Sequence, residues 1–229
     1  MARRSCGVIG LGLFGRRIAL TLSQMGMDVL AVDRDEALIE AIKDQVTAAV
    51  CTDVTDERAL LASGLPGVDV CVVAIGENME SSILVTALLK KHGVQHVIAR
   101  AHSDIHAQVL RTVGALRTVD PEDEMGVRVA EEIFAPDVHA RIRLSTGQEV
   151  VEVLAHRNLI GKTIQELDFR RKYRLNIIAI KRPRPGADPA DGPSAFEVIR
   201  LPRPEDALEP GDVLVLIGDA EMVRAFLEL

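Results

Sequence analysis

The sequence predicts an α/β fold, in which a doubly wound, parallel, six-stranded sheet is followed by a smaller α+β domain. Short apolar segments alternate with helical patterns, at intervals of about 20 to 25 residues, through residue 120. Hydrophobic residues make up 48% of the chain but aromatic residues only 3%, which favours an aliphatic sheet covered by helices on both faces. A glycine-rich loop also follows the first apolar segment.

The six apolar segments are predicted to be strands, and the segments between and after them to be helices. Because strand and helix alternate, right-handed crossovers and parallel pairing are expected. The predicted strands are 6–9, 29–32, 48–51, 70–75, 96–99 and 116–119. The predicted helices are about 14–25, 36–44, 56–63, 78–92, 104–113 and 122–134.

The pattern changes after residue 134, where Ala135-Pro136-Asp137 ends the last helix. We therefore expect a Rossmann-like domain at 1–134, a hinge at 135–141 and a small α+β domain at 142–229. Strands are predicted in this second domain at 150–154, 175–181 and 213–217. The loop at 183–194 is rich in Pro, Gly and Asp and is typical of a hairpin tip.

Composition excludes several classes of protein. The net charge is −7 and the pI about 5.4, so no basic surplus is present to neutralise a nucleic-acid backbone. Cys6, Cys51 and Cys71 are an odd number and each falls in a predicted strand, which favours buried, reduced thiols in the cytoplasm. We expect neither a signal peptide nor a membrane span.

The glycine loop Gly10-Leu11-Gly12-Leu13-Phe14-Gly15 is the strongest functional motif. A Gly-x-Gly-x-x-Gly match alone is weak, but here it follows a strand and opens a helix. Gly10 permits a tight turn, Gly12 lets the backbone approach a pyrophosphate, and Gly15 lets the helix pack closely. Asp33 ends the second strand, where an acid hydrogen-bonds ribose hydroxyls. The loop therefore predicts a nucleotide site.

Other candidate residues follow from the rule that ligands bind beyond the carboxyl ends of parallel strands. Asp53 follows the third strand and is either an acceptor for an adenine amino group or a helix cap, for which Thr55 competes. Arg100 ends the fifth strand and is either a phosphate ligand or a surface ion-pair partner. Ala74, Ile75 and Gly76 close the fourth strand, and Asn78 lies just beyond it.

Two further clusters have ordinary structural explanations. His102 and His106 lie four residues apart and resemble a metal pair, but no third ligand is evident, so solvent-facing histidines are the preferred interpretation. The basic run 170–174 is either a phosphate site or a cluster of cations at a helix end.

Ordered motifs extend over nearly the whole chain and together resemble one family. In the first half they are Val8-Ile9-Gly10-Leu11-Gly12 with Phe14-Gly15, Ala31-Val32-Asp33, Asp53-Val54-Thr55-Asp56, Val73-Ala74-Ile75-Gly76 and Pro121-Glu122-Asp123-Glu124-Met125-Gly126. In the second half they are Leu159-Ile160-Gly161-Lys162-Thr163, Asn176-Ile177-Ile178-Ala179-Ile180-Lys181-Arg182 and Gly211-Asp212-Val213-Leu214. The chain resembles the cytoplasmic regulatory subunits of bacterial Trk and Ktr potassium-uptake systems, which are built from RCK (regulator of potassium conductance) domains.

The resemblance implies a homodimer that assembles into a ring of eight beneath a membrane potassium transporter, attached peripherally to the inner membrane. It implies that ATP, ADP, NAD or NADH binds the first domain and that cyclic di-AMP binds at the dimer interface of the second domain. It also implies a divalent or monovalent cation at a dimer interface, near Glu122. Transferred by position, the nucleotide residues are Gly10, Gly12, Leu13, Phe14, Gly15, Asp33, Arg34, Asp53, Val54, Ala74, Ile75, Gly76, Asn78, Arg100 and Glu122. Those for cyclic di-AMP are Arg170, Asn176, Ile177 and Ile178.

The chain departs from this family at Leu13, where relatives of the ATP-switched type carry an arginine that reaches the terminal phosphate. Discrimination between ATP and ADP is therefore in question.

Two alternative functions fit the sequence less well. A small NAD(P)-dependent oxidoreductase shares the glycine loop and Asp33, but the second domain shows no catalytic motif around its two histidines, His139 and His156. A DNA-binding repressor conflicts with the acidic first half.

Overall fold

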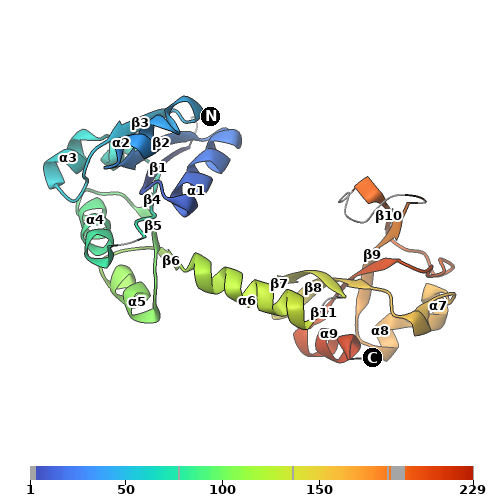
Figure 1. Cartoon of the computed structure of the whole chain (residues 1–229). Coiled ribbons are helices and arrows are strands. Elements are labelled where there is room, and N and C mark those ends of the chain that lie inside the picture. The colour runs from blue at the N-terminus through green and yellow to red at the C-terminus, as the bar shows by residue number, and fades with distance from the viewer. Residues whose placement is uncertain (1–3, 77, 136, 185, 187–193, 229) are drawn as a thin grey trace. The chain divides into compact units, whose positions relative to one another are not determined.

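The computed structural model describes the chain except for residues 1–3, 77, 136, 185, 187–193 and 229 (Figure 1). Two compact units can be distinguished, Met1–Val127 and Arg128–Leu229, and each is described by itself. Most of the tip of the loop predicted at 183–194 lies outside the described residues, as does Pro136.

The first unit contains a six-stranded parallel sheet with the strand order β3-β2-β1-β4-β5-β6, which confirms the predicted doubly wound fold. The order reverses between β1 and β4, the position at which sheets of this type bind their ligands. The predicted fourth strand is two residues too long, because the chain turns away after Val73. The strands are β1 (Ser5–Ile9), β2 (Asp28–Asp33), β3 (Ala48–Cys51), β4 (Val70–Val73), β5 (His96–Arg100) and β6 (Arg117–Val119).

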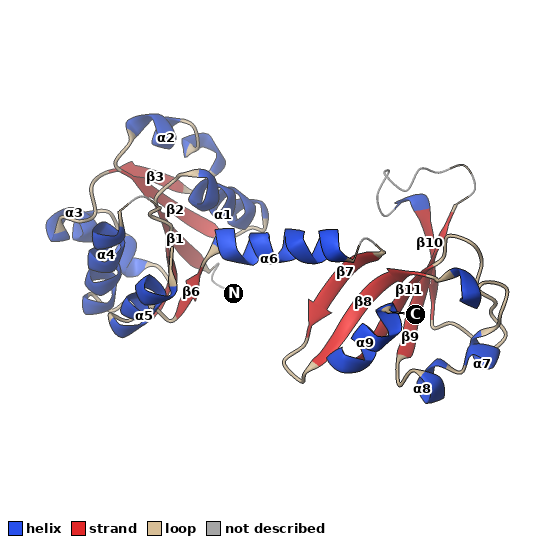
Figure 2. Ribbon diagram, turned by 60° about the horizontal axis from the view of Figure 1, so that its bottom comes forward, coloured by secondary structure: helices blue, strands red, loops and turns tan. Residues whose placement is uncertain are grey.

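Helices cover both faces of this sheet, with α1 and α2 on one side and α3, α4 and α5 on the other (Figure 2). The predicted helix at 36–44 is wrong in its second half, because α2 ends at Glu40 and a 3-10 turn follows at Lys43–Gln45. The helices are α1 (Leu13–Gln24), α2 (Glu36–Glu40), α3 (Glu57–Ala62), α4 (Met79–Lys91), α5 (Asp104–Thr112) and α6 (Pro121–Phe134).

Short polar side chains begin five of these helices by accepting a hydrogen bond from a backbone N–H of the first turn. The cap of α3 corrects the sequence analysis, which considered Asp53 and Thr55. The cap is Asp56, whose carboxylate accepts from the N–H groups of Arg58 and Ala59 at 2.8 and 2.9 Å. The five caps are Asp35, Asp56, Asn78, Ser103 and Asp120.

The core of the first unit is aliphatic, as the composition predicted, and its central strands are buried on both faces. Cys6 and Cys71 lie in this core, where burial raises the pKa of their thiols to about 11 and about 12. Cys51 is exposed, which corrects the expectation of three buried thiols. The reason is that β3 forms the edge of the sheet, so its last residue is not covered on both sides.

The second unit is built on a five-stranded antiparallel sheet with the order β10-β9-β11-β8-β7. Three of these strands match the predicted ones, whereas β7 and β10 were not predicted. The strands are β7 (Val138–Arg143), β8 (Gln148–Leu154), β9 (Asn176–Pro183), β10 (Phe196–Arg200) and β11 (Val213–Asp219). The helices are α7 (Ile164–Leu167), α8 (Phe169–Lys172) and α9 (Ala220–Leu227).

An aromatic cluster and a buried ion pair fix the second unit. Phe169, Tyr173 and Phe226 lie with their ring centroids 5.2 to 5.5 Å apart and join α8 to α9. Asp212, which is fully buried, accepts two hydrogen bonds from the guanidinium of Arg182, both at 2.9 Å. This bidentate ion pair holds the turn before β11 against β9, because leaving a buried carboxylate without its cation would be strongly destabilising.

The segment 135–141, which was predicted as a hinge, is described by the structure except for Pro136. Its last four residues belong to β7, and the division between the compact units falls between Val127 and Arg128, inside α6. The segment from Val138 to Arg143 alternates between apolar and polar residues, as strands do. Its partner is β8, and this pairing is what makes it a strand.

Candidate functional site

The glycine loop folds at the carboxyl end of β1 as the motif predicted. Gly10 has a φ of +88°, and its N–H donates to the carbonyl of Val32 at 2.9 Å. A Cβ atom on Gly15 would lie 1.9 Å from the carbonyl oxygen of Gly10, so only glycine lets α1 start this close to β1. A Cβ on Gly12 would meet no atom within 4 Å. The loop therefore presents open space in front of the N-terminus of α1.

The carboxylate of Asp33 holds this loop to the end of β2. One oxygen accepts a hydrogen bond from the N–H of Leu11 at 2.6 Å, and the other accepts from the N–H of Asp35 at 2.9 Å. A carboxylate has about four acceptor positions, so two remain for ribose hydroxyls. The exposed Arg34 follows directly. Asp33 therefore supports the glycine loop in addition to the ribose contact expected from the sequence.

Asp53 closes a tight turn after β3. One of its oxygens accepts hydrogen bonds from the hydroxyl and the N–H of Thr55 at 2.7 and 3.0 Å. These bonds hold the pKa of Asp53 below its ordinary value, so the side chain is a carboxylate at neutral pH. Val54, the next residue, is buried. The carboxylate of Asp53 lies at the same edge of the sheet as that of Asp33.

The loop after β4 lies beside the glycine loop. Ala74 donates its N–H to the carbonyl of Ile9 at 2.7 Å, and Ile75 is half-buried. Asn78 caps α4, because its side-chain oxygen accepts from the N–H of Ser81 at 2.9 Å. This use of Asn78 was not foreseen, and it leaves one lone pair of the oxygen and the side-chain NH2 group for a ligand.

The guanidinium of Arg100 lies among residues from three segments. It pairs with the carboxylate of Glu122 in the first turn of α6 and lies 5.9 Å from the ring centroid of Phe14. A Cβ on Gly76 would lie 2.8 Å from its Nη1 atom. Its Nε atom is buried and has no hydrogen-bond partner among the described residues. The sequence left Arg100 as either a phosphate ligand or a surface ion-pair partner, and it did not identify Glu122 as that partner.

The side chain of Leu13 is 97% exposed at the start of α1. Arg16 and Arg17 follow on the same helix and are also exposed. The first turn of α1 contains no acidic residue, so its free N–H groups and the helix dipole favour an anion. The site thus combines an anion-binding helix end with acceptors for sugar hydroxyls, the two properties that a nucleotide requires.

Comparisons with known proteins identify the family. The models of the TrkA-N domain and the TrkA-C domain match residues 6–121 and 149–229. The chain is 37% identical over 224 residues to Ktr system potassium uptake protein C of Bacillus subtilis (strain 168), covering 98% of this chain and 96% of that one. The chain belongs to the Ktr family of potassium uptake proteins. This confirms the resemblance seen in the sequence.

Two solved structures share the fold of this Ktr protein. The GsuK channel is 19% identical with a TM-score of 0.65, covering 98% of this chain and 39% of that chain. The NAD(P)-binding domain of an exopolyphosphatase-related protein from Archaeoglobus fulgidus is 26% identical with a TM-score of 0.51, covering 58% of this chain and 98% of that chain. In the described part of the Ktr chain, no helix is both long and apolar enough to span a bilayer.

His106 of the Ktr protein is buried, which corrects the expectation that both histidines face solvent. Its Nε2 atom lies 2.9 Å from the hydroxyl of Ser82 on α4, and its ring stacks on that of the exposed His102 at 5.6 Å. Burial lowers the pKa of His106, and the neighbouring His102 lowers it further. Among the described residues, no group of three metal-binding side chains is present, so the pair is part of the contact between α4 and α5.

The residues expected at a second ligand lie together at the start of β9. Arg170 donates from Nε to the side-chain oxygen of Asn176 at 2.9 Å, so the basic run is joined to the strand. Ile177 packs against the core of the second unit, whereas Ile178 is 39% exposed on the other face. Neighbouring strand residues point to opposite faces, so a ligand on one face would contact Asn176 and Ile178 but not Ile177.

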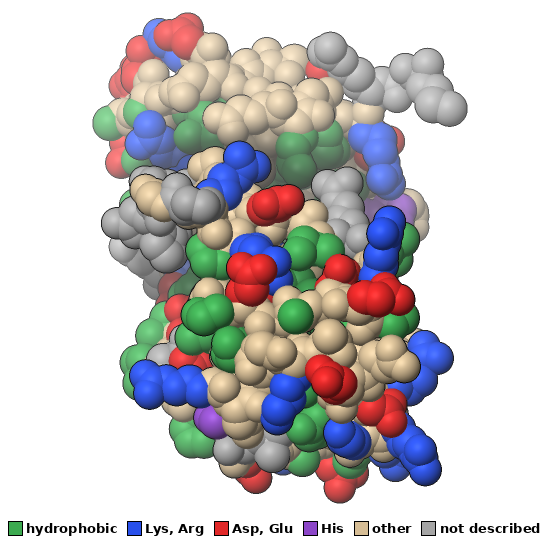
Figure 3. Space-filling view, turned by 90° about the vertical axis from the view of Figure 1, so that its right-hand side faces the viewer, with side chains coloured by type: hydrophobic (Ala, Val, Ile, Leu, Met, Phe, Trp, Pro, Cys, Tyr) green, Lys and Arg blue, Asp and Glu red, His purple; other side chains and the backbone are tan. Residues whose placement is uncertain are grey.

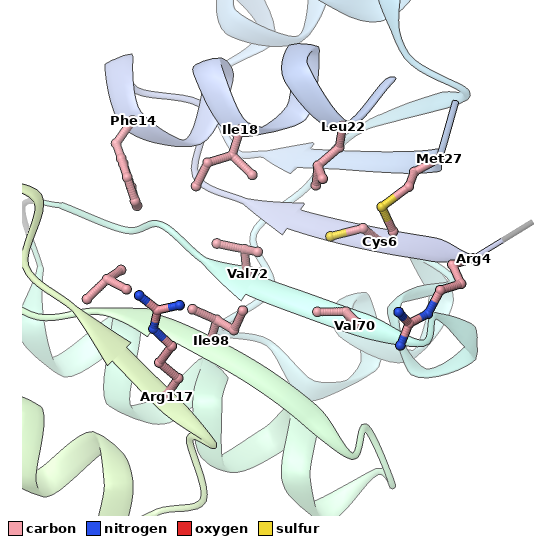
Figure 4. Close-up of a pocket in the computed structure, with 11 residues that line it drawn as sticks. Arg4, Cys6, Phe14, Ile18, Leu22, Met27, Val70, Val72, Ile98 and Arg117 are labelled. Atoms are coloured by element: carbon pink, nitrogen blue, oxygen red, sulfur yellow. The ribbon is translucent and has the colours of Figure 1, made fainter. Parts of the chain in front are cut away.

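A cavity of about 360 Å³ in the first unit does not include the nucleotide-site carboxylates. Phe14, Ile18 and Leu22 of α1 face Val72 of β4 and Ile98 of β5 across it (Figure 4). Arg4 and Arg117 also line the cavity, so its walls are mostly but not wholly apolar. On the face shown in Figure 3, acidic and basic side chains are interspersed, in keeping with the exclusion of nucleic acid.

Proposed function

We propose that this Ktr-family chain is a regulatory subunit that binds an adenine nucleotide and thereby controls a membrane potassium transporter of the Trk or Ktr type. The observation that carries the proposal is the glycine loop, held open in front of α1 by the carboxylate of Asp33. Regulation follows if the nucleotide binds one conformation of the assembly more tightly than another, because only differential affinity shifts such an equilibrium.

In this proposal the nucleotide, as ATP, ADP, NAD or NADH, lies across the ends of β1 to β5. The N–H groups at the start of α1 and the guanidinium of Arg100 bind the phosphates. Asp33 accepts from the ribose hydroxyls and Asp53 from the adenine amino group. Glu122 contributes to a cation site at a dimer interface. Leu13, Phe14, Arg34, Val54, Ala74, Ile75, Gly76 and Asn78 complete the walls.

The chain is proposed not to be an enzyme. An oxidoreductase would need an acid or a base beside a substrate in the second unit. His156 is exposed, and its side chain does not accept a hydrogen bond from the N–H groups of the 3-10 turn that follows it. The side chain of His139 lies outside the described part of the chain. A turnover assay with NADH or NADPH and simple carbonyl substrates checks this, and steady oxidation would contradict a purely regulatory role.

The proposed assembly is a homodimer that forms an octameric ring on the cytoplasmic face of the membrane. We expect light scattering on the purified chain to show self-association, and calorimetry to show binding of adenine nucleotides. Comparing ATP, ADP, NAD and NADH on one preparation identifies the physiological ligand. A strict monomer at every concentration, with and without nucleotide, would contradict the ring, whereas the absence of any nucleotide binding would contradict the site.

Leu13 predicts weak discrimination between ATP and ADP. Its exposed side chain supplies no charge for a third phosphate, whereas an arginine would add charge-assisted hydrogen bonds. We expect Leu13→Arg to raise the affinity for ATP about tenfold and that for ADP much less. Calorimetry measures both, with Leu13→Gln as the uncharged control. A strong preference for ATP in the parent would show that the sensor of the terminal phosphate lies elsewhere, such as on a partner subunit.

We also propose that cyclic di-AMP binds the second unit at a dimer interface. The supporting observation is that Arg170 and Asn176 are hydrogen-bonded beside the exposed Ile178. Asn176→Ala should weaken binding, because it removes both a ligand contact and the partner of Arg170. Thermal shift of the full chain with cyclic di-AMP is the measurement, and no shift at saturating concentration would rule the site out.

A further inference from the structure

The side chain of Arg100, the cation expected at the phosphates, is paired with a carboxylate. Glu122 accepts a hydrogen bond from Nη2 of Arg100, and the side chains of these residues are 65% and 18% exposed. The guanidinium occupies the space left by the missing side chain of Gly76 and faces the ring of Phe14. Arg100 is therefore held between the loops that follow β1 and β4, and is tied to the first turn of α6.

This ion pair is easy to displace. A pair in which one partner is largely solvated contributes little stability, whereas hydrogen bonds between a guanidinium and a phosphate are short and strong. The Nε atom of Arg100 is buried and has no hydrogen-bond partner among the described residues, so the present position of the guanidinium leaves one of its donors unsatisfied. A phosphate that approaches from α1 would therefore attract the guanidinium away from Glu122.

We propose that Glu122 and the phosphates of the nucleotide compete for Arg100, and that this exchange passes the binding event to α6. The proposal rests on the proposed nucleotide site and adds the regulatory step. The helix α6 begins beside Arg100 at Pro121 and continues to Phe134, whereas the second compact unit begins at Arg128. A change in the first turn of α6 is thus carried by the backbone of one helix towards the second unit.

Calorimetry with ADP on the full chain, in EDTA to exclude bound cations, tests the competition. Glu122→Gln frees Arg100 and should tighten ADP binding roughly twofold to fivefold, the size expected for a partly exposed ion pair. Asp123→Asn is the matched control, because it removes one charge from an exposed neighbour in the same turn and should leave the affinity unchanged. The gain from Glu122→Gln should vanish in an Arg100→Gln background.

Several results would overturn the proposal. The first is that Glu122→Gln binds ADP more weakly than the parent or with the same affinity. The second is that Asp123→Asn gains as much ADP affinity as Glu122→Gln does. The third is that Glu122→Gln still raises ADP affinity in an Arg100→Gln background. If Arg100→Gln does not fold, the comparison of Glu122→Gln with Asp123→Asn still decides. A parent that binds no ADP contradicts the nucleotide site itself, whereas a parent that binds ADP without the gain contradicts the competition alone.

Hydrogen exchange provides an independent measure of the link to α6. Saturating ADP should speed the exchange of the amides in the first turn of α6 in the parent, because the bond that anchors Glu122 is lost. The Glu122→Gln chain should exchange rapidly without ADP and respond little to it. An equal response in both chains, or none in the parent, would overturn the link.

Discussion

We expect Gly15→Ala to abolish nucleotide binding and to destabilise the first unit by about 3 kcal/mol, at the upper end of the usual cost of overpacking. The added methyl group would lie 1.9 Å from the carbonyl oxygen of Gly10 and 2.9 Å from the Cβ of Ala74. The first contact is with backbone, so α1 must move away from β1. The N–H groups at its start would then no longer point at the phosphates.

Gly12→Ala is the matched control, because the same methyl group there meets nothing within 4 Å and the φ of Gly12 is −59°. We expect its stability to stay within about 0.5 kcal/mol of the parent, while the nucleotide affinity falls about tenfold or more because the methyl group fills the space for the pyrophosphate. Chemical denaturation and calorimetry on both variants measure the two effects. Equal stability of Gly15→Ala and Gly12→Ala would contradict the close approach of α1 and β1.

The fold of the first unit was predictable because local patterns determine it. Each buried parallel strand is a short apolar run, and each crossover helix has its own periodicity. The glycine loop was predictable for the same reason, since Gly10, Gly12 and Gly15 lie within six residues. The prediction of the α3 cap was wrong because several neighbouring residues can fill the same role. Asp53, Thr55 and Asp56 are all capable caps, and only the backbone conformation selects Asp56.

Other errors arose where residues distant in the sequence decide the outcome. His106 has the spacing of an exposed helical histidine, but Ser82 of α4 covers it. The strands β7 and β10 lie at the two edges of their sheet, so each is fixed by a single neighbouring strand. The pair between Arg100 and Glu122 joins residues 22 positions apart. Periodicity within one element carries no information about such partners.

Asp33→Ala is expected to weaken nucleotide binding by about 1.5–3 kcal/mol, the size of hydrogen bonds to a charged group. Two causes combine. The ribose hydroxyls lose their acceptor. The N–H of Leu11 loses the carboxylate oxygen to which it donates at 2.6 Å, so the glycine loop is no longer held. Unlike the parent, this variant should also show a glycine loop that is loose before ligand binds, with faster amide exchange at Leu11 and Gly12.

Two control variants separate these causes. Asp35→Ala removes the cap of α2, at a cost of about 1 kcal/mol in stability. It should leave nucleotide affinity unchanged, because the Asp35 side chain accepts a hydrogen bond from the N–H of Ala37 in α2 and not from the glycine loop. Asp33→Asn keeps one acceptor oxygen for Leu11 and should bind with intermediate affinity. Calorimetry with ADP on the three variants gives the order. In the described chain, Asp33 is the carboxylate at the end of β2 that holds the glycine loop. If Asp33→Ala binds ADP as tightly as the parent does, neither the ribose nor the loop depends on this carboxylate, and the ribose does not lie at the end of β2.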